Sequence, residues 1–132
     1  MNEKILYKEL SYQLVGCFYE VYNQLGPGYK EIIYHNALAI ELKGNHISFE
    51  EERHLLVEYK GKRVGMYVPD FIVDEKILVE VKAVEIMPKL YEVQLYHYLK
   101  ATPYTLGYMV NFAGARLDIR RRVYDTVRVN SR

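Results

Sequence analysis

The segment from Val68 to Lys82 constrains the fold most, because two apolar runs are separated there by the polar turn Asp74-Glu75-Lys76. A turn centred on Glu75 pairs Val73 with Ile77, Phe71 with Val79, and Asp70 with Glu80. Since side chains alternate between the two faces of a strand, this register gives one wholly apolar face, made of Phe71, Val73, Ile77, Val79 and Val81. The opposite face holds Asp70, Ile72, Leu78, Glu80 and Lys82. A shift of one residue would mix the two faces, so the sequence predicts an antiparallel hairpin in this register.

The mixed face of this hairpin brings two carboxylates together. Residues opposite each other in an antiparallel pair have Cβ atoms roughly 4.5 to 5.5 Å apart, so Asp70 and Glu80 would repel as bare charges. A hard divalent cation such as Mg²⁺ would satisfy both, with Lys82 on the same face. The alternative is a solvent-exposed ion-pair patch at a sheet edge. Ile72 and Leu78 lie between the charges and favour a partly covered face, on which charges need partners.

Two helices are predicted ahead of the hairpin. Apolar residues at three- and four-residue steps predict the first from about Lys4 to Leu25, and Gly26-Pro27-Gly28 ends it. The second helix is predicted from near Tyr29 to Lys43. We expect its buried face to hold Ile33, Ala37 and Ile40. A second side of this helix carries Glu31, Tyr34, Leu38 and Glu41, and the surface is the favoured place for Glu41.

The rest of the chain predicts strands and one further helix. Residues 46–59 alternate in part between apolar and polar side chains, which predicts an extended segment. A strand from about Arg63 then runs into the hairpin, which is expected over about 63–83. Pro88 suits the first turn of a helix that reaches about Ala101. Residues 105–112 and 116–123 predict two more strands, so that the C-terminal strands occupy about 105–123.

Composition limits the classes of protein to consider. The 132 residues are 50% hydrophobic, enough for a single domain, 1–132, with one core. With 18 Lys and Arg against 17 Asp and Glu, the net charge of +1 gives no global attraction to nucleic acid or membrane. The apolar stretches are too short for a signal peptide or membrane span, so we expect a soluble, cytoplasmic protein. Cys17 is expected to be a buried structural thiol, and the four histidines lack the close ligand pair typical of zinc sites.

Two motifs carry a resemblance to a known family. Asp70, preceded by Pro69 and followed after nine residues by Glu80-Val81-Lys82, resembles the PD-(D/E)XK nuclease signature. The run Gly28-Tyr29-Lys30-Glu31-Ile32-Ile33-Tyr34, with Leu25-Gly26-Pro27 ahead of it, is similar to the element of the GxxExxY protein family in that superfamily. Further matches are Gln94, Tyr98, Asn111-Phe112 and Arg121, so the likeness spans nearly the whole chain. The chain departs from the pattern at Tyr91, where family members often carry histidine.

The resemblance implies a fold and a set of roles. The expected fold class is α/β, a central mixed β-sheet flanked by helices with a restriction-endonuclease-like core. Asp70 and Glu80 would hold Mg²⁺ or Mn²⁺, helped by the backbone carbonyl of Val81. Lys82 would orient the attacking water or stabilise charge on the phosphate oxygens. Glu31 would enter the site from its helix, Gln94 would reach it from the next helix, and Gly28, Tyr34 and Tyr98 would support it; without the resemblance, Glu31 reads as an exposed helix carboxylate.

Two functions therefore compete. The leading interpretation is a Mg²⁺-dependent nuclease that hydrolyses phosphodiester bonds of DNA, ahead of RNA. The alternative is a non-catalytic module on the same fold that binds nucleic acid or protein, and the near-neutral charge favours it because counterion release scales with the phosphates neutralised. The Arg120-Arg121-Arg122 run could touch phosphates or form a solvated edge. A two-fold homodimer is the default expectation for assembly; substrate type and pathway stay open.

Overall fold

The computed structural model describes residues 6–124, which form a five-stranded sheet, a separate two-stranded sheet and three helices. The helices are α1 (Lys8–Leu25), α2 (Glu31–Gly44) and α3 (Lys89–Ala101). The large sheet has the order β1-β4-β5-β6-β7, with β1 (Phe49–Glu51), β4 (Phe71–Val73), β5 (Ile77–Lys82), β6 (Leu106–Asn111) and β7 (Asp118–Val123). The small sheet pairs β2 (Leu55–Tyr59) with β3 (Lys62–Tyr67).

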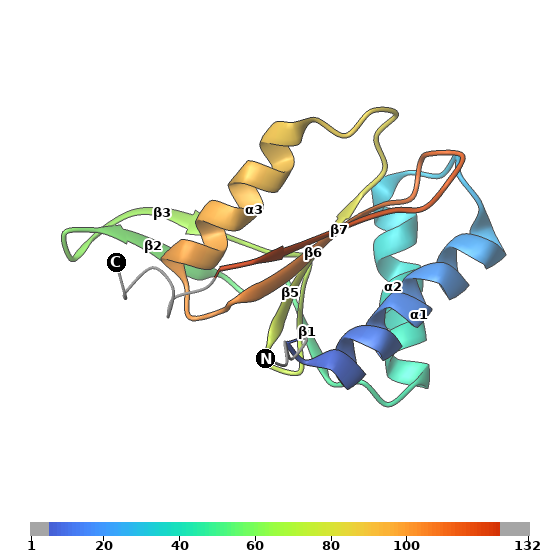
Figure 1. The fold of residues 1–132 in the computed structure, drawn as a ribbon, viewed down its shortest axis with the longest axis horizontal. Helices are drawn as coiled ribbons and strands as arrows, with labels where there is room; N and C mark the ends of the chain where they lie inside the picture. The colour runs from blue at the N-terminus through green and yellow to red at the C-terminus, as the bar shows by residue number, and fades with distance from the viewer. Residues whose placement is uncertain (1–5, 125–132) are drawn as a thin grey trace, which may run out of the picture.

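The large sheet is mixed and lies between helices. β5 and β6 are parallel, with α3 as their crossover, while the other three pairings are antiparallel. Figure 1 shows α1 and α2 together on one side of the sheet, α3 on the other, and the β2–β3 hairpin extending away from the sheet beneath α3. This arrangement confirms the predicted α/β class with a central mixed sheet flanked by helices. No helix within residues 6–124 is long and apolar enough to cross a membrane.

The predicted hairpin register is confirmed, and it separates two apolar layers. Phe71 pairs with Val79, Ile72 with Leu78, and Val73 with Ile77. The wholly apolar face packs against α1 and α2 in a cluster that includes Leu14, Phe18, Leu38, Phe71, Val79 and Val81. The mixed face packs against α3 and the β2–β3 hairpin through Tyr67, Ile72, Leu78, Leu95 and Leu99. Ile72 and Leu78 are almost completely buried, so the face that carries the acidic residues is covered rather than wet.

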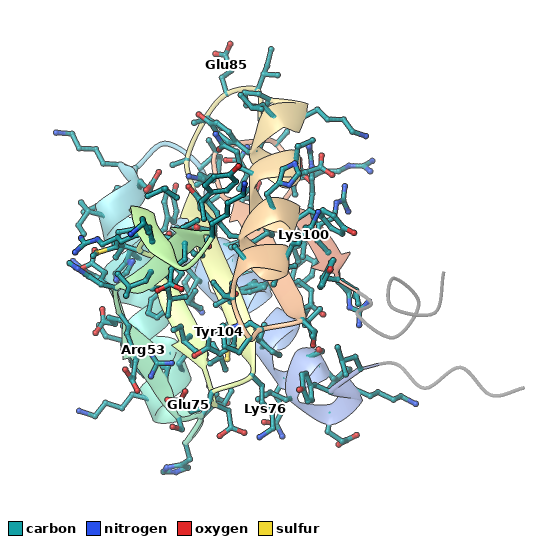
Figure 2. The ribbon with its side chains drawn as sticks, turned by 90° about the vertical axis from the view of Figure 1, so that its left-hand side faces the viewer. Arg53, Glu75, Lys76, Glu85, Lys100 and Tyr104 are labelled. Atoms are coloured by element: carbon teal, nitrogen blue, oxygen red, sulfur yellow. The ribbon has the colours of Figure 1, made fainter. Side chains whose placement is uncertain are left out.

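The turn of this hairpin is tied to neighbouring loops. Arg53 donates to Glu75 in the turn, with Nη2 2.9 Å from Oε1, and also donates to the hydroxyl of Tyr104. Figure 2 shows Arg53, Glu75 and Tyr104 at one end of the molecule and Glu85, in the loop after β5, at the opposite end. The carboxyl end of β5, which leads to Glu85, therefore lies far from the anchored turn.

The predicted buried face of the second helix is wrong at Ile33 and Ile40, whereas Ala37 is partly buried against the core. Ile33 and Ile40 are 41% and 74% exposed, whereas Tyr34, Leu38 and Leu42 are fully buried. Tyr34 orients the helix, because its hydroxyl donates to the carbonyl of Gly26 at 2.6 Å and its ring stacks on Phe112 at 4.7 Å between centroids. The stripe that joins Tyr34 to Leu38 therefore faces the sheet. The first two residues of the predicted first helix, 4 and 5, lie outside the described residues.

The extended segments also differ from the prediction in their pairing. Residues 46–59 form two strands in different sheets, separated at Glu52, which has a positive φ of 53°. The predicted strand from Arg63 into the hairpin is likewise divided into β3 and β4 at Val68-Pro69-Asp70. Proline has no N–H to give to a ladder, which explains the interruption. Asp70 therefore stands just before β4, where the chain passes from the small sheet to the large one.

Candidate active site

Asp70 is fixed at the entrance to β4 by two contacts. Its Oδ2 accepts a hydrogen bond from the backbone N–H of Val81 at 2.8 Å, so the carboxylate lies against the end of β5. Its Oδ1 lies 3.0 Å from Nδ1 of His35 on α2. The side chain is 17% exposed, which leaves the carboxylate accessible from one side. The β4–β5 ladder ends at the Phe71–Val79 pair, so the predicted Asp70–Glu80 pair is not part of it; Asp70 stands just outside, where its charge adds to the effect of burial in raising the pKa of Glu80.

Glu80 lies in a largely desolvated position on β5. Burial raises the pKa of its carboxyl to about 8; the negative charge of Asp70 acts in the same direction, while the hydrogen bond from Tyr67 and the charge of Lys82 act against it. The Tyr67 hydroxyl donates this bond to Oε2. Burial, then the charge of Glu80, also raises the pKa of Tyr67, so the phenol stays a donor. Two adjacent carboxylates, one of them with a raised pKa, mark a functional-site candidate.

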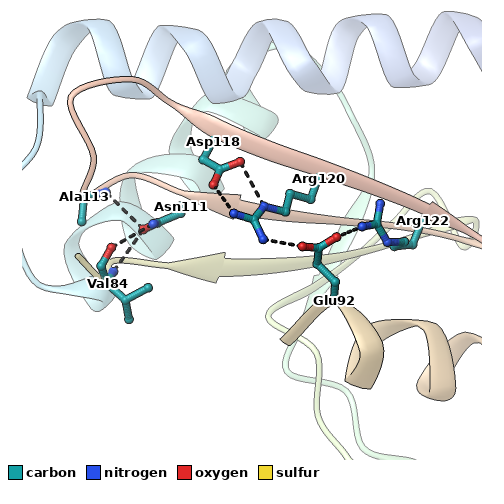
Figure 3. A network of polar contacts seen from close by, with 7 residues as sticks. All are labelled: Val84, Glu92, Asn111, Ala113, Asp118, Arg120 and Arg122. Atoms are coloured by element: carbon teal, nitrogen blue, oxygen red, sulfur yellow. Dashed lines mark hydrogen bonds and ion pairs between the residues drawn. The ribbon is translucent and has the colours of Figure 1, made fainter. Parts of the chain in front are cut away.

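Lys82 stands two residues beyond Glu80 on the same face. Its Nζ lies 4.9 Å from the ring centroid of Tyr91 on α3, a cation–π contact that holds the ammonium over the mixed face. Lys82 pairs with Asn111 of β6 in the parallel ladder. Figure 3 shows the Asn111 amide bridging the chain after each strand: it accepts from the N–H of Val84 and of Ala113, and it donates to the carbonyl of Val84. This clamp fixes the strand ends from which Lys82 projects.

Glu31 lies on the same side of the molecule as these residues. It is the first residue of α2, and its side chain is open to solvent. Partial desolvation raises the pKa of its carboxyl; the charge of Lys82 lowers it and that of Asp70 raises it. Since both charges act on Glu31, its carboxylate is near enough to the site to interact with it. The N-terminal position on a helix also favours a negative charge there.

His35 contacts the candidate site and was not predicted from the sequence. The ring is 4% exposed, and its Nε2 lies 2.9 Å from Oε1 of Glu51 on β1 while Nδ1 faces Asp70. Burial by itself lowers the pKa of His35, but the hydrogen bonds to Glu51 and Asp70 outweigh it, so the pKa is raised. The spacing of histidines gave no sign of this role, since its partners are carboxylates far away in the chain. One feature of the sequence could have indicated it: His35 is a polar residue directly after Tyr34, on the side of α2 that is buried.

The remaining predicted residues take different places. Gly28 has a φ of 116°, a conformation that favours glycine, in the turn where the N–H of Tyr29 donates to the Tyr34 hydroxyl. Tyr98 stacks on Tyr67, with centroids 3.8 Å apart, and so backs the residue that bonds Glu80. Gln94 is exposed on α3, and within residues 6–124 its amide makes no hydrogen bond to the acidic residues. Gly28 and Tyr34 therefore meet in the turn before α2 and Tyr98 lies against Tyr67, while Gln94 stays at the surface between Tyr91 and Tyr98.

The arginine run on β7 is divided between two environments. Arg120 and Arg122 both pair with Glu92 of α3, which is 6% exposed, and Arg120 also pairs with Asp118 at 2.8 Å. Figure 3 shows Glu92 between the two guanidinium groups. Arg121 points to the other face, beside Ser11 and Tyr108. These contacts join α3 to β7, so Arg120 and Arg122 act first as structural cations.

The donor set fits a hard divalent cation. Asp70 and Glu80 supply adjacent carboxylates in a partly buried place, and the backbone of Val81 lies against Asp70. Within the described part of the chain no three side chains of His, Cys, Asp or Glu converge into a ready-made metal cage. Mg²⁺ is commonly held by one or two carboxylates together with water and substrate phosphate, so a two-carboxylate site suits it. A cation there would also oppose the burial and the charge of Asp70, which together raise the pKa of Glu80.

A mixed sheet with helices on both faces, an Asp at the entrance to β4 and a Glu-x-Lys on the adjacent strand β5 define the α/β class with a PD-(D/E)XK core. A family model of the PD-(D/E)XK nuclease superfamily matches residues 8–122, so the chain belongs to that superfamily. Its members are generally hydrolytic nucleases and typically use divalent metal ions. No curated protein and no solved structure matches the chain significantly.

Proposed function

We propose that the protein is a metal-dependent nuclease that hydrolyses phosphodiester bonds of nucleic acid, with DNA ahead of RNA as substrate. The observation that carries this proposal is the pair of adjacent carboxylates, Asp70 and Glu80, beside the ammonium of Lys82. Burial keeps the pKa of Glu80 at about 8, which is unfavourable for a carboxylate that serves only as a surface charge. Superfamily membership supports nuclease chemistry as the use of this arrangement.

Each residue of the core has a separate role in the proposal. Asp70, Glu80 and the carbonyl of Val81 would hold Mg²⁺ or Mn²⁺. Such an ion, when bound, polarises a phosphate and lowers the pKa of water. Lys82 would place positive charge beside the phosphate oxygens, where negative charge builds as water attacks phosphorus. Its contact with Tyr91 limits the positions of the ammonium, which reduces the reorganisation needed during reaction.

Two further residues are assigned from the resemblance to the GxxExxY family. Glu31 would add a ligand to the metal or fix the attacking water, and partial desolvation raises the pKa of its carboxyl. Gln94 would contact the substrate, because it is exposed on α3 between two tyrosines that touch the site. Gly28, Tyr34 and Tyr98 would support the site without taking part in the reaction.

The β2–β3 hairpin is the proposed contact for the nucleic-acid backbone. Lys60, Lys62 and Arg63 are all exposed at its tip, and Tyr59 beside them is 62% exposed. The base of the hairpin is Tyr67, which bonds Glu80, so the basic tip belongs to the same element as the site. Lysine and arginine that neutralise phosphates release counterions, which gives affinity without sequence preference. A local basic element therefore compensates for a net charge of only +1.

A substrate screen tests this function. Single-stranded and double-stranded DNA and RNA are incubated with Mg²⁺, Mn²⁺ or EDTA, beside an Asp70→Asn/Glu80→Gln double variant whose folding is checked by thermal melting. Cleavage that needs the metal and disappears in the variant supports the nuclease. Binding of nucleic acid without cleavage under every condition would instead favour a non-catalytic module on the same fold.

A further inference from the structure

We infer that His35 is a positioning residue for the metal site, holding the Asp70 carboxylate through Nδ1 while Glu51 anchors the ring through Nε2. The inference rests on the proposed function and deepens it, since neither His35 nor Glu51 belongs to either motif. The two contacts are short, 3.0 Å to Asp70 and 2.9 Å to Glu51. They join α2 and β1, which follow each other in the chain, to the start of β4 about 20 residues further on.

The ring of His35 has little freedom to turn. It is 4% exposed, and it stacks on Phe71 with centroids 4.4 Å apart and planes inclined by 20°. Phe71 directly follows Asp70, so the same stack fixes the histidine relative to the backbone that carries the carboxylate. With Glu51 on the far nitrogen, the near nitrogen can face only Asp70.

Asp70 needs such support because of its place in the fold. It precedes the first ladder pair of β4 and follows Pro69, which cannot donate to a strand. The Val81 N–H fixes one carboxylate oxygen at 2.8 Å, but one contact leaves the carboxylate plane free to rotate. The second contact, from His35, sets that plane and hence the direction of the lone pairs left for a cation. Residues behind a metal ligand commonly change metal affinity or activity about 10- to 100-fold when replaced.

The competing explanation is that His35 only fills space in the core. Two substitutions separate the explanations because they keep different atoms of the imidazole. His35→Asn places an amide nitrogen near the position of Nδ1 and keeps a donor for Asp70, whereas His35→Gln reaches toward Glu51 and loses that donor. Packing alone predicts that His35→Asn does at least as much damage as His35→Gln, because the asparagine side chain is one methylene shorter and leaves the larger cavity.

Calorimetry with Mn²⁺ alone, without nucleic acid, provides the test. We expect His35→Gln to weaken Mn²⁺ affinity about 10-fold or more, and His35→Asn less than about 3-fold. Glu51→Ala removes the acceptor for Nε2 and should weaken Mn²⁺ affinity several-fold; because the Glu51 side chain is 45% exposed, its removal leaves the core intact. His97→Gln on the exposed face of α3 is the matched control and should equal wild type. Melting in EDTA checks that each variant is folded.

Two results would overturn the inference alone, with Mn²⁺ still bound by wild type. The first is an affinity in His35→Asn that is equal to or weaker than that in His35→Gln, and the second is wild-type affinity in folded Glu51→Ala. Wild-type protein that binds no Mn²⁺ would overturn the proposed metal site and this inference together. The order wild type, His35→Asn, His35→Gln, from tightest to weakest, supports it.

Discussion

The rings of Tyr67 and Tyr98 stack almost parallel, with planes inclined by 5°. This contact joins the end of the β2–β3 hairpin to α3, and the Tyr67 hydroxyl then reaches Glu80. An exposed hairpin, a covering helix and an acidic residue of the central sheet are therefore connected through one aromatic pair. The pair places the proposed backbone-binding element beside the proposed metal ligand.

Tyr67→Phe is expected to destabilise the protein by about 1 to 3 kcal/mol, because the buried Glu80 carboxyl loses its donor while the stack remains. Tyr98→Phe is the matched control, since within residues 6–124 the Tyr98 hydroxyl has no hydrogen-bond partner. Its free energy of unfolding should stay within about 0.5 kcal/mol of wild type. Urea denaturation at neutral pH measures both. Equal losses in the two variants would show that the hydrogen bond to Glu80 adds nothing to stability.

Glu80→Gln is expected to change the pH dependence of stability in EDTA. The folded-state pKa of Glu80 is about 8, raised from an ordinary value of 4.5. Between these values the folded state keeps a proton that the unfolded state has lost, so the free energy of unfolding falls as pH rises. The raised pKa of His35 gives a slope of the same sign, and the difference between wild type and Glu80→Gln isolates Glu80.

The variant should match wild type at acid pH and exceed its stability above pH 8 by the order of a few kcal/mol. Added Mn²⁺ should stabilise wild type at that pH, because a ligand that binds only the folded state shifts the unfolding equilibrium. Urea denaturation at several pH values measures the difference. Two curves that stay parallel across the whole range would mean that Glu80 titrates normally in the folded protein.

The sequence predicted the hairpin correctly because its two faces have opposite character. In the register that pairs Phe71 with Val79, every side chain on one face is apolar, and the alternatives mix the faces. The same argument failed for α2, since apolar residues occupy both sides of it. The spacing of Ile33 and Ile40 fits a helical period, and the spacing of Tyr34 and Leu38 fits it equally. The side with Tyr34 and Leu38 is the buried one, and Tyr34 stacks there on Phe112, which is far away in the sequence. No local pattern predicts that contact.

The site was predictable where neighbours in the sequence are neighbours in space. Asp70, Glu80 and Lys82 follow from one hairpin, so strand alternation places them. His35 contacts Asp70 and Glu51 only because α2, β1 and β4 pack together, and the spacing of these residues in the sequence does not predict the contacts. The separation of β2 and β3 from the large sheet escaped prediction for a related reason. Alternation of apolar and polar residues predicts that a segment is extended, but it does not predict which strand that segment pairs with.

Glu92→Gln is expected to reduce stability by roughly 1 to 3 kcal/mol, because a buried carboxylate between Arg120 and Arg122 is lost. Glu85→Gln, in the exposed loop before α3, is the matched control and should be neutral within about 0.5 kcal/mol. Urea denaturation measures the stability, and calorimetry should show unchanged Mn²⁺ affinity in both. A Glu92→Gln protein with wild-type stability would contradict the structural role of this network.

Replacing the basic tip of the hairpin should weaken nucleic-acid binding without changing Mn²⁺ affinity. In the Lys60→Ala/Lys62→Ala/Arg63→Ala variant, fewer phosphates are neutralised, so affinity should depend less steeply on salt. The logarithmic slope should fall by roughly 1 to 3 for three lost charges. Fluorescence anisotropy with labelled duplex DNA over a range of salt concentrations measures it. The triple variant Lys8→Ala/Lys43→Ala/Lys76→Ala, changed at exposed lysines of other elements, is the control. An unchanged slope in the hairpin variant would place the contact elsewhere.

The central claim is that Lys82 serves phosphodiester chemistry beside Asp70 and Glu80. Lys82→Ala removes a cation–π contact with Tyr91, which costs about 0.5 to 1 kcal/mol, so the variant should fold normally. It should still bind Mn²⁺, since both carboxylates remain. Lys89→Ala, an exposed lysine at the start of α3, is the matched control.

The most direct measurement is the single-turnover rate of metal-dependent cleavage of the best substrate from the screen, for wild type, Lys89→Ala and Lys82→Ala. We expect wild-type rates for Lys89→Ala and a loss of about 10²-fold or more for Lys82→Ala, because charge on the phosphate oxygens loses its stabilising cation. A folded, Mn²⁺-binding Lys82→Ala protein that cleaves at the wild-type rate would contradict this expectation.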